Sequence, residues 1–131
     1  MPSYETNRKL NAIAKAFLGE YEFRSVAALA KEADCTTDEV FNLCHQLGYN
    51  TSLRRTSDSA PLVGVGDGYN PRAVWAVTDA LLDERYTLRT LKAVFDAAPG
   101  VDPSEVMDFA AEFDYDTSKT RRRDGAAMIG L

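Results

Sequence analysis

Apolar residues recur at helical spacing in three stretches of the first part of the chain. Over about residues 8–19 they fall three and four positions apart, which predicts an amphipathic helix. A short extended segment follows at residues 21–23, and Ser25 can cap a second helix that ends near Ala33. In TTDE, residues 36–39, a capping oxygen precedes a glutamate by three positions, which predicts the start of a third helix.

The second part of the chain has the same pattern. A helix is expected over about residues 71–85, with Pro71 suited to its first turn, and an extended segment over 86–88. Thr90 can cap the next helix, which ends near Ala98, and DPSE, residues 102–105, begins the last one. The apolar stripes expected on the two third helices are Val40, Leu43, Cys44 and Leu47, and Val106, Phe109, Ala110 and Phe113.

These parallels reflect an internal repeat. An offset of 66 places residues 39–65 over 105–131 without a gap, and nine of these 27 positions are identical. Average residue usage would give roughly one or two identities by chance. Two single-residue insertions extend the match upstream, so that Leu10 and Ile13 fall over Val74 and Val77. The sequence therefore predicts a tandem duplication, with copies at 1–65 and 72–131 and a linker at 66–71.

Each copy ends in a predicted β-hairpin. Polar and β-branched residues lead from Tyr49 or Tyr115 into a turn, SDSA or RDGA, and a short apolar strand returns. In the second copy Asp124-Gly125 is a strong turn signal, because glycine accepts positive φ. Helix, short strand, two further helices and a hairpin is the order of the winged helix-turn-helix family, which each copy resembles over about residues 10–65 and 72–131. The expected fold class is mainly α with short β-hairpins (α+β), as two tandem winged helix-turn-helix domains.

The resemblance implies that the third helix enters the major groove of DNA while the hairpin, or wing, touches the backbone or minor groove. In the first copy Asn42 and Gln46 could each pair with an adenine edge, and Thr37 could meet a phosphate or a thymine methyl. The corresponding helix of the second copy carries carboxylates that would repel phosphate: Glu105, Asp108 and Glu112.

The distribution of charge bears on DNA binding, because the protein is acidic overall and many of its basic residues are concentrated in the two predicted wings. The formal net charge is −5 at pH 7. Residues 1–66 carry seven Lys or Arg against eight Asp or Glu, and residues 67–131 carry eight against twelve. Basic residues nevertheless gather in the two wings, as Arg54 and Arg55 in the first and as Lys119, Arg121, Arg122 and Arg123 in the second.

Two functions fit this distribution. The first is a small, transcription-regulatory protein that binds double-stranded DNA through the first copy's third helix and both wings. The second is a module that docks on a protein of the transcription or replication machinery through acidic helix faces, with Glu105, Asp108 and Glu112 as contacts. Trp75 either packs between the copies or serves as an interface hot spot. A continuous positive face joining the wings would support DNA binding, and wings on opposite sides would argue against it.

Other chemistries find little support in the sequence. His45 is the only histidine, so neither a catalytic pair nor a four-ligand zinc site is expected, and no cofactor or small-molecule substrate is evident. Cys35 and Cys44 would lie roughly 12 Å apart along a helix, beyond disulfide reach. GVGDGYNP, residues 64–71, follows a hairpin and is interpreted as a linker instead of a phosphate loop. Because the sequence shows neither a signal peptide nor a membrane span, we expect a cytoplasmic protein. Because no catalytic constellation is evident, we expect that it is not an enzyme.

Overall fold

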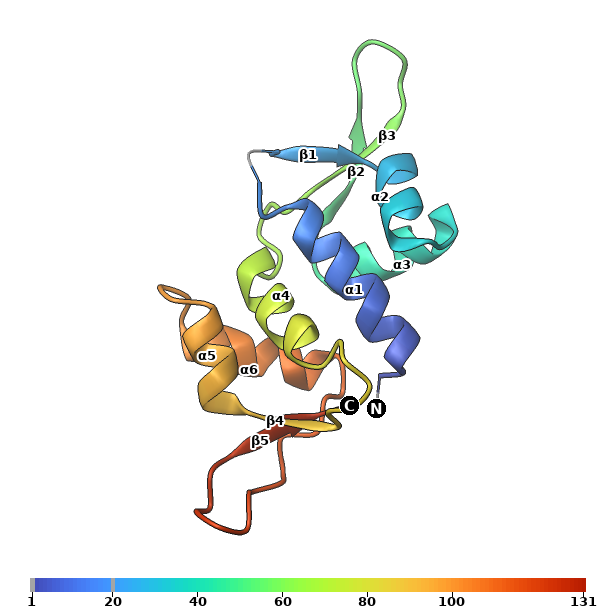
Figure 1. The fold of residues 1–131 in the computed structure, drawn as a ribbon. Coiled ribbons are helices and arrows are strands. Elements are labelled where there is room, and N and C mark those ends of the chain that lie inside the picture. Colours follow the sequence, from blue (N-terminus) through green and yellow to red (C-terminus); the bar gives the residue numbers. More distant parts are fainter. Residues whose placement is uncertain (1, 20) are drawn as a thin grey trace.

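The first half of the chain folds into three helices and three short strands. The computed structural model describes residues 2–19 and 21–131. The elements of this half are α1 (Tyr4–Ala16), β1 (Phe23–Ser25), α2 (Val26–Ala33), α3 (Thr37–Gln46), β2 (Asn50–Arg54) and β3 (Pro61–Gly64). The strands form an antiparallel sheet in the order β1-β3-β2. Residues 50–64, here named hairpin 1, extend from the top of the molecule (Figure 1).

The second half repeats this order with fewer strands. It contains α4 (Pro71–Ala80), β4 (Leu88–Thr90), α5 (Leu91–Ala97), α6 (Pro103–Glu112) and β5 (Met128–Gly130). Strand β4 pairs antiparallel with β5, and single bridges join Asp116 to Gly130 and Thr120 to Ala127. Residues 116–130, named hairpin 2, extend from the bottom of the molecule (Figure 1). The described residues thus form an α+β fold of six helices with a three-stranded and a two-stranded antiparallel sheet.

The helix caps predicted from the sequence are confirmed. Ser25 Oγ accepts a hydrogen bond from Ala28 N at 3.1 Å, and Thr90 Oγ1 accepts one from Ala93 N at 3.2 Å. Thr36 and Asp102 cap α3 and α6 in the same way. These bonds satisfy backbone donors that have no partner within a helix, which fixes where each helix starts.

Several predicted boundaries were wrong. Helix α1 begins at Tyr4 because Ser3 Oγ accepts from Thr6 N at 3.0 Å. Helix α4 ends at Ala80, well before Arg85, since Asp83 Oδ1 accepts from Arg85 N in a local turn that competes with helical hydrogen bonding. Strands β1 and β4 lie two residues later than expected, in register with β3 and β5.

The two halves share one hydrophobic core. Helix α1 packs along α4, and Leu10 and Ile13 on one side and Val74 and Val77 on the other are fully buried. The buried cluster continues without a break from α1 through α4 to Phe109 of α6. Burying these apolar surfaces against each other stabilises the contact between the halves, which favours a single rigid arrangement.

A buried polar network crosses the same contact. Asn7 Nδ2 donates to the Thr78 carbonyl at 3.0 Å, and Asn11 Nδ2 donates to Thr78 Oγ1 at 3.1 Å. The Tyr115 hydroxyl donates to Asn7 Oδ1 at 2.7 Å. Because an unmade buried hydrogen bond is costly, this network sets the register of α1 on α4.

The segment predicted as a linker, residues 66–71, is packed between the halves. Tyr69 N donates to the Leu47 carbonyl at 3.1 Å, and the Tyr69 ring meets Phe109 edge-on at 5.8 Å between centroids. A Cβ on Gly68 would lie only 2.3 Å from Tyr49 Cδ1, so this close approach requires glycine. The segment therefore helps to hold the two halves together.

Candidate nucleic-acid interface

The turns of the two hairpins are built identically. In hairpin 1 the Arg55 guanidinium donates to both carboxylate oxygens of Asp58, at 2.9 and 2.8 Å, and in hairpin 2 Arg121 donates to Asp124 at 3.0 and 2.6 Å. Each carboxylate also accepts the backbone N–H two residues on. The arginine hydrogen bonds hold the pKa of Asp58 down to about 2 and lower that of Asp124 as well. Arg55 and Arg121 therefore brace their own turns.

The remaining predicted cations of the hairpins are exposed. Four cations of the hairpins form no ion pair with any other described residue: Arg54, Lys119, Arg122 and Arg123. Three of the four belong to hairpin 2. At the repeat positions of Arg122 and Arg123, hairpin 1 carries the neutral Thr56 and Ser57. Hairpin 2 is consequently the more basic of the two.

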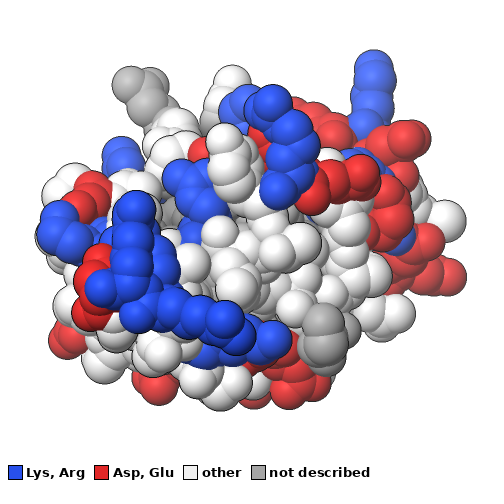
Figure 2. Space-filling model, turned by 60° about the horizontal axis from the view of Figure 1, so that its bottom comes forward, with Lys and Arg blue, Asp and Glu red and all other residues white. Residues whose placement is uncertain are grey.

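The hairpins project from opposite ends of the molecule (Figure 1). Figure 2 looks onto the end that carries hairpin 2 and shows Lys and Arg gathered mainly on one side of this face, with Asp and Glu mainly on the other. The structure therefore does not bring Arg54 and Arg55 together with Lys119 and its neighbours. Among the described residues the cations of the two hairpins therefore lie at opposite ends of the molecule, an arrangement that argues against DNA binding through both wings together.

The predicted base-reading residues of α3 are accessible. Thr37, Asn42 and Gln46 are all exposed, as are Asp38 and His45 on the same helix. None of the five is a lysine or arginine, so the exposed side chains of this helix offer hydrogen bonds without a phosphate anchor. Of the cations in this half that were predicted to contact phosphate, Arg54 on β2 follows α3 most closely in the sequence.

The acidic residues of α6 divide between internal and exposed roles. Glu105 is half-buried, and its Oε1 accepts a hydrogen bond from Asn70 N at 2.7 Å, so it helps to dock the 66–71 segment. Asp108 and Glu112 are exposed. Glu105 and Glu112 line an open hollow of about 440 Å³ with Asp67 and Tyr69. Such a surface repels phosphate and suits a cationic partner.

Trp75 is half-buried and packs against the shared core. It lies on α4, the helix that contacts α1. This position fits the packing interpretation of Trp75 and leaves part of its surface accessible.

Two tyrosine–arginine pairs were missed by the sequence interpretation. The Arg24 guanidinium carbon lies 4.8 Å from the centre of the Tyr21 ring, and Arg89 lies 5.2 Å from that of Tyr86. Both rings are at least half exposed, at 64% and 50%. The signal was present as YEFR and YTLR, residues 21–24 and 86–89, which keep tyrosine and arginine three positions apart in both halves.

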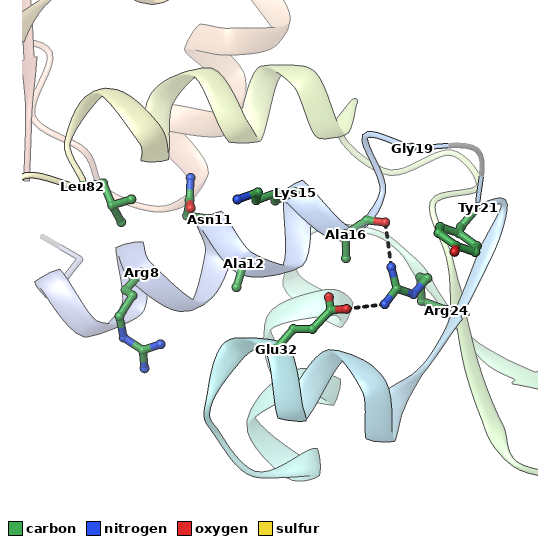
Figure 3. A pocket seen from close by; sticks show the side chains of 10 residues that line it. All are labelled: Arg8, Asn11, Ala12, Lys15, Ala16, Gly19, Tyr21, Arg24, Glu32 and Leu82. Atoms are coloured by element: carbon green, nitrogen blue, oxygen red, sulfur yellow. Dashed lines mark hydrogen bonds and ion pairs between the residues drawn. The ribbon is translucent and has the colours of Figure 1, made fainter.

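A hollow beside α1 is lined by charged side chains that are mostly paired with one another or with nearby groups. It has a volume of about 550 Å³ and is lined mainly by α1, by Tyr21 and Arg24, and by Glu32 of α2 (Figure 3). Arg24 donates to Glu32 and to the Ala16 carbonyl, while Arg8 pairs with Glu5. Most of the positive charge around this hollow is therefore matched internally.

Neither a disulfide nor a metal-binding cluster is present among the described residues. Cys35 and Cys44 are free thiols, and burial raises the pKa of Cys44 to about 12, which suppresses the reactive thiolate. No group of three or more His, Cys, Asp or Glu side chains in residues 2–19 and 21–131 is placed to hold a metal ion. Nor does any helix of these residues have the length and apolar content needed to cross a bilayer.

Comparisons with protein-family models, curated proteins and solved structures give no match for this chain. The functional argument accordingly depends on the geometry of the hairpins and helices themselves.

Proposed function

We propose that the chain is a small DNA-binding, transcription-regulatory protein made of two tandem winged helix-turn-helix units. Support for this fold comes from the repeated order of elements and from the tight turn between the second and third helices. That turn contains a left-handed residue in both halves, Asp34 at φ 50° and Gly100 at φ 84°. A hairpin then follows the third helix at the position of a wing.

The observation that carries the DNA proposal is the exposed, protruding and basic hairpin 2. Lys119, Arg122 and Arg123 are exposed, and the Arg121–Asp124 pair braces the turn on which they stand. A preorganised hairpin loses less conformational entropy on binding than a flexible one. Phosphate is the natural ligand, because several cations on a protruding element match a phosphate backbone and release its counterions.

In this proposal hairpin 2 is the principal phosphate contact. Hairpin 1 projects from the other end and offers Arg54 as its unpaired cation among the described residues. Thr37, Asn42 and Gln46 belong to this distant half, and their contact with bases stays a prediction. The acidic α6 beside hairpin 2 implies binding by the wing with little reading of bases.

The proposal is tested by electrophoretic mobility shift with a mixed-sequence duplex at 50 and 200 mM salt. Three phosphate contacts imply a salt slope of about −2.7, and so a loss of affinity of about 40-fold over this interval. The triple variant K119A/R122A/R123A should lose both the retardation and the salt dependence. Arg54→Ala is the matched control and should retain most of the affinity. Absence of any shift at 50 mM salt with wild-type protein refutes DNA binding.

The acidic hollow favours a second function, docking on a protein of the transcription or replication machinery. Glu112, Asp67 and Tyr69 line this hollow, and Asp108 is exposed on the same helix. A pull-down with wild-type protein and with D108N/E112Q separates the two functions. A protein recovered by the wild type and lost from the variant supports docking, whereas recovery of nucleic acid alone argues against it.

A further inference from the structure

Tyr86 is an exposed aromatic ring flanked by two guanidinium groups. Its side chain is 50% exposed, and it stands two residues before β4. The guanidinium carbons of Arg89 and Arg85 lie 5.2 and 5.8 Å from the ring centre. Arg85 pairs with Asp83, while Arg89 forms no ion pair within residues 2–19 and 21–131. The exposed ring therefore has one guanidinium beside it, that of Arg89, which no described carboxylate pairs with.

The ring lies at the base of hairpin 2. Strand β4 pairs with β5, the return strand of this hairpin, with Leu88 opposite Gly130. A Cβ on Gly130 would lie 2.7 Å from the carbonyl oxygen of Thr87, the residue after Tyr86. Four residue steps from Gly130 to Ala126 near the tip span about 13 Å at 3.3 Å per residue, and Tyr86 lies two residues beyond Leu88 on the side away from the tip. The aromatic ring and the hairpin cations therefore belong to one end of the molecule.

An exposed aromatic ring next to cations matches the chemistry of single-stranded nucleic acid. The bases of a strand can stack on aromatic side chains while its phosphates meet Lys and Arg. Inside a duplex both faces of a base are already covered by neighbouring bases, so Tyr86 has no base face to stack on. We propose that Tyr86 stacks on an unpaired base of a single strand whose phosphates contact Lys119, Arg122 and Arg123. This inference rests on the proposed function of hairpin 2 and adds single-stranded nucleic acid as a second ligand of the same cations.

The other half of the chain provides an internal control. Tyr21 is 64% exposed and has Arg24 at 4.8 Å from its ring centre. Arg24 is paired with Glu32, and hairpin 1 carries Thr56 and Ser57 where hairpin 2 has two arginines. A tyrosine without a basic hairpin beside it should not support binding.

The experiment measures fluorescence anisotropy with a labelled oligothymidine strand and with a labelled duplex. The variants are Tyr86→Ala, Tyr86→Phe, Tyr21→Ala and K119A/R122A/R123A, each checked for folding by circular dichroism. Loss of one stacked base should weaken single-strand binding by Tyr86→Ala about 5- to 150-fold. Tyr86→Phe keeps the ring and should bind like the wild type, as should Tyr21→Ala. Duplex binding by Tyr86→Ala should be unchanged.

The outcomes separate this inference from the proposal beneath it. Wild-type affinity of folded Tyr86→Ala for the single strand overturns the stacking role, even where the triple variant has lost duplex binding. Failure of wild-type protein to bind the single strand overturns it too. If the triple variant binds both probes like the wild type, hairpin 2 is not the phosphate contact, and the proposed function fails with the inference.

Discussion

Hairpins 1 and 2 combine the same turn with different tips. Each turn contains a bidentate arginine–aspartate ion pair, formed by Arg55 and Asp58 in hairpin 1 and by Arg121 and Asp124 in hairpin 2. Between them hairpin 1 presents Thr56 and Ser57, whereas hairpin 2 presents Arg122 and Arg123. The turn is constrained by its own hydrogen bonds and stays constant, while the tip is exposed and free to change. The two hairpins thus carry different charge at the tip of the same Arg–Asp turn.

The contact between the halves also differs between repeat counterparts. Tyr115 donates a buried hydrogen bond to Asn7, but its repeat counterpart Tyr49 has a buried hydroxyl with no partner among the described residues. In the repeat alignment the position of Asn7 corresponds to Pro71, whose side chain has no acceptor. Each half therefore contributes a buried tyrosine to the core, yet only one of the two hydroxyls is satisfied.

The largest predicted effect comes from removing these two hydroxyls one at a time. Tyr115→Phe leaves the Asn7 amide oxygen buried without a donor, so unfolding free energy should fall by about 1–3 kcal/mol. Tyr49→Phe removes an unsatisfied hydroxyl and should leave stability unchanged or slightly raised. Denaturant unfolding of both variants checks the contrast. Equal losses would show that the two tyrosines are equivalent in solution.

The sequence predicted the parts of this fold that depend on local chemistry. Capping oxygens at Ser25, Thr36 and Thr90 identified where helices begin, since a cap acts within three residues of itself. The hairpins followed from the repeat and from Asp124-Gly125. The ends of α1 and α4 were wrong because Ser3 and the Asp83 turn decide them, and both signals are weaker than apolar periodicity.

The relative placement of the halves could not be predicted, and much of the candidate site depends on it. Nothing in the local pattern around Asn7 or Thr78 indicates that these residues meet across the molecule. Opposite placement of the hairpins follows from α1 packing on α4, which is a long-range contact. The Tyr86–Arg89 pair was overlooked because its spacing, although repeated at Tyr21 and Arg24, does not indicate whether the ring will be buried or exposed.

Exchanging the tips tests whether charge alone distinguishes the hairpins. The variant R122T/R123S gives hairpin 2 the tip of hairpin 1, and loss of two phosphate contacts should weaken duplex binding about tenfold at moderate salt. Adding T56R/S57R to this variant places the same charge on the same turn at the other end, and should restore most of the affinity. Mobility shift at fixed salt measures both. If the variant with all four substitutions still binds the duplex weakly, hairpin 2 contributes more to binding than the charge of its tip.

A smaller contrast lies in the left-handed residue of each turn. Ser59 has φ 60° and its counterpart Gly125 has φ 71°. A side chain in this region is strained, so Ser59→Gly should stabilise by about 0.5 kcal/mol and Gly125→Ser should destabilise by about 1 kcal/mol. Thermal unfolding of the two variants reads out the difference. Destabilisation by Ser59→Gly would mean that the Ser59 side chain contributes an interaction that outweighs the strain.

The smallest effect concerns how the braced turns respond to acid. Arg55 holds the pKa of Asp58 at about 2, below its ordinary value of 3.8, so this pair stabilises hairpin 1 at neutral pH and is lost as the pH falls through about 2. Asp124 also has a lowered pKa, with Arg121 as the main cause and Arg123 at the tip adding to it. Carboxyl carbon shifts followed by NMR should therefore show both Asp58 and Asp124 titrating well below the ordinary pKa of an aspartate, 3.8. Because R122T/R123S removes the extra arginine, it should raise the pKa of Asp124 and leave that of Asp58 unchanged. Ordinary titration of both carboxyls near pH 4 would show that the Arg–Asp pairs do not hold either turn in solution.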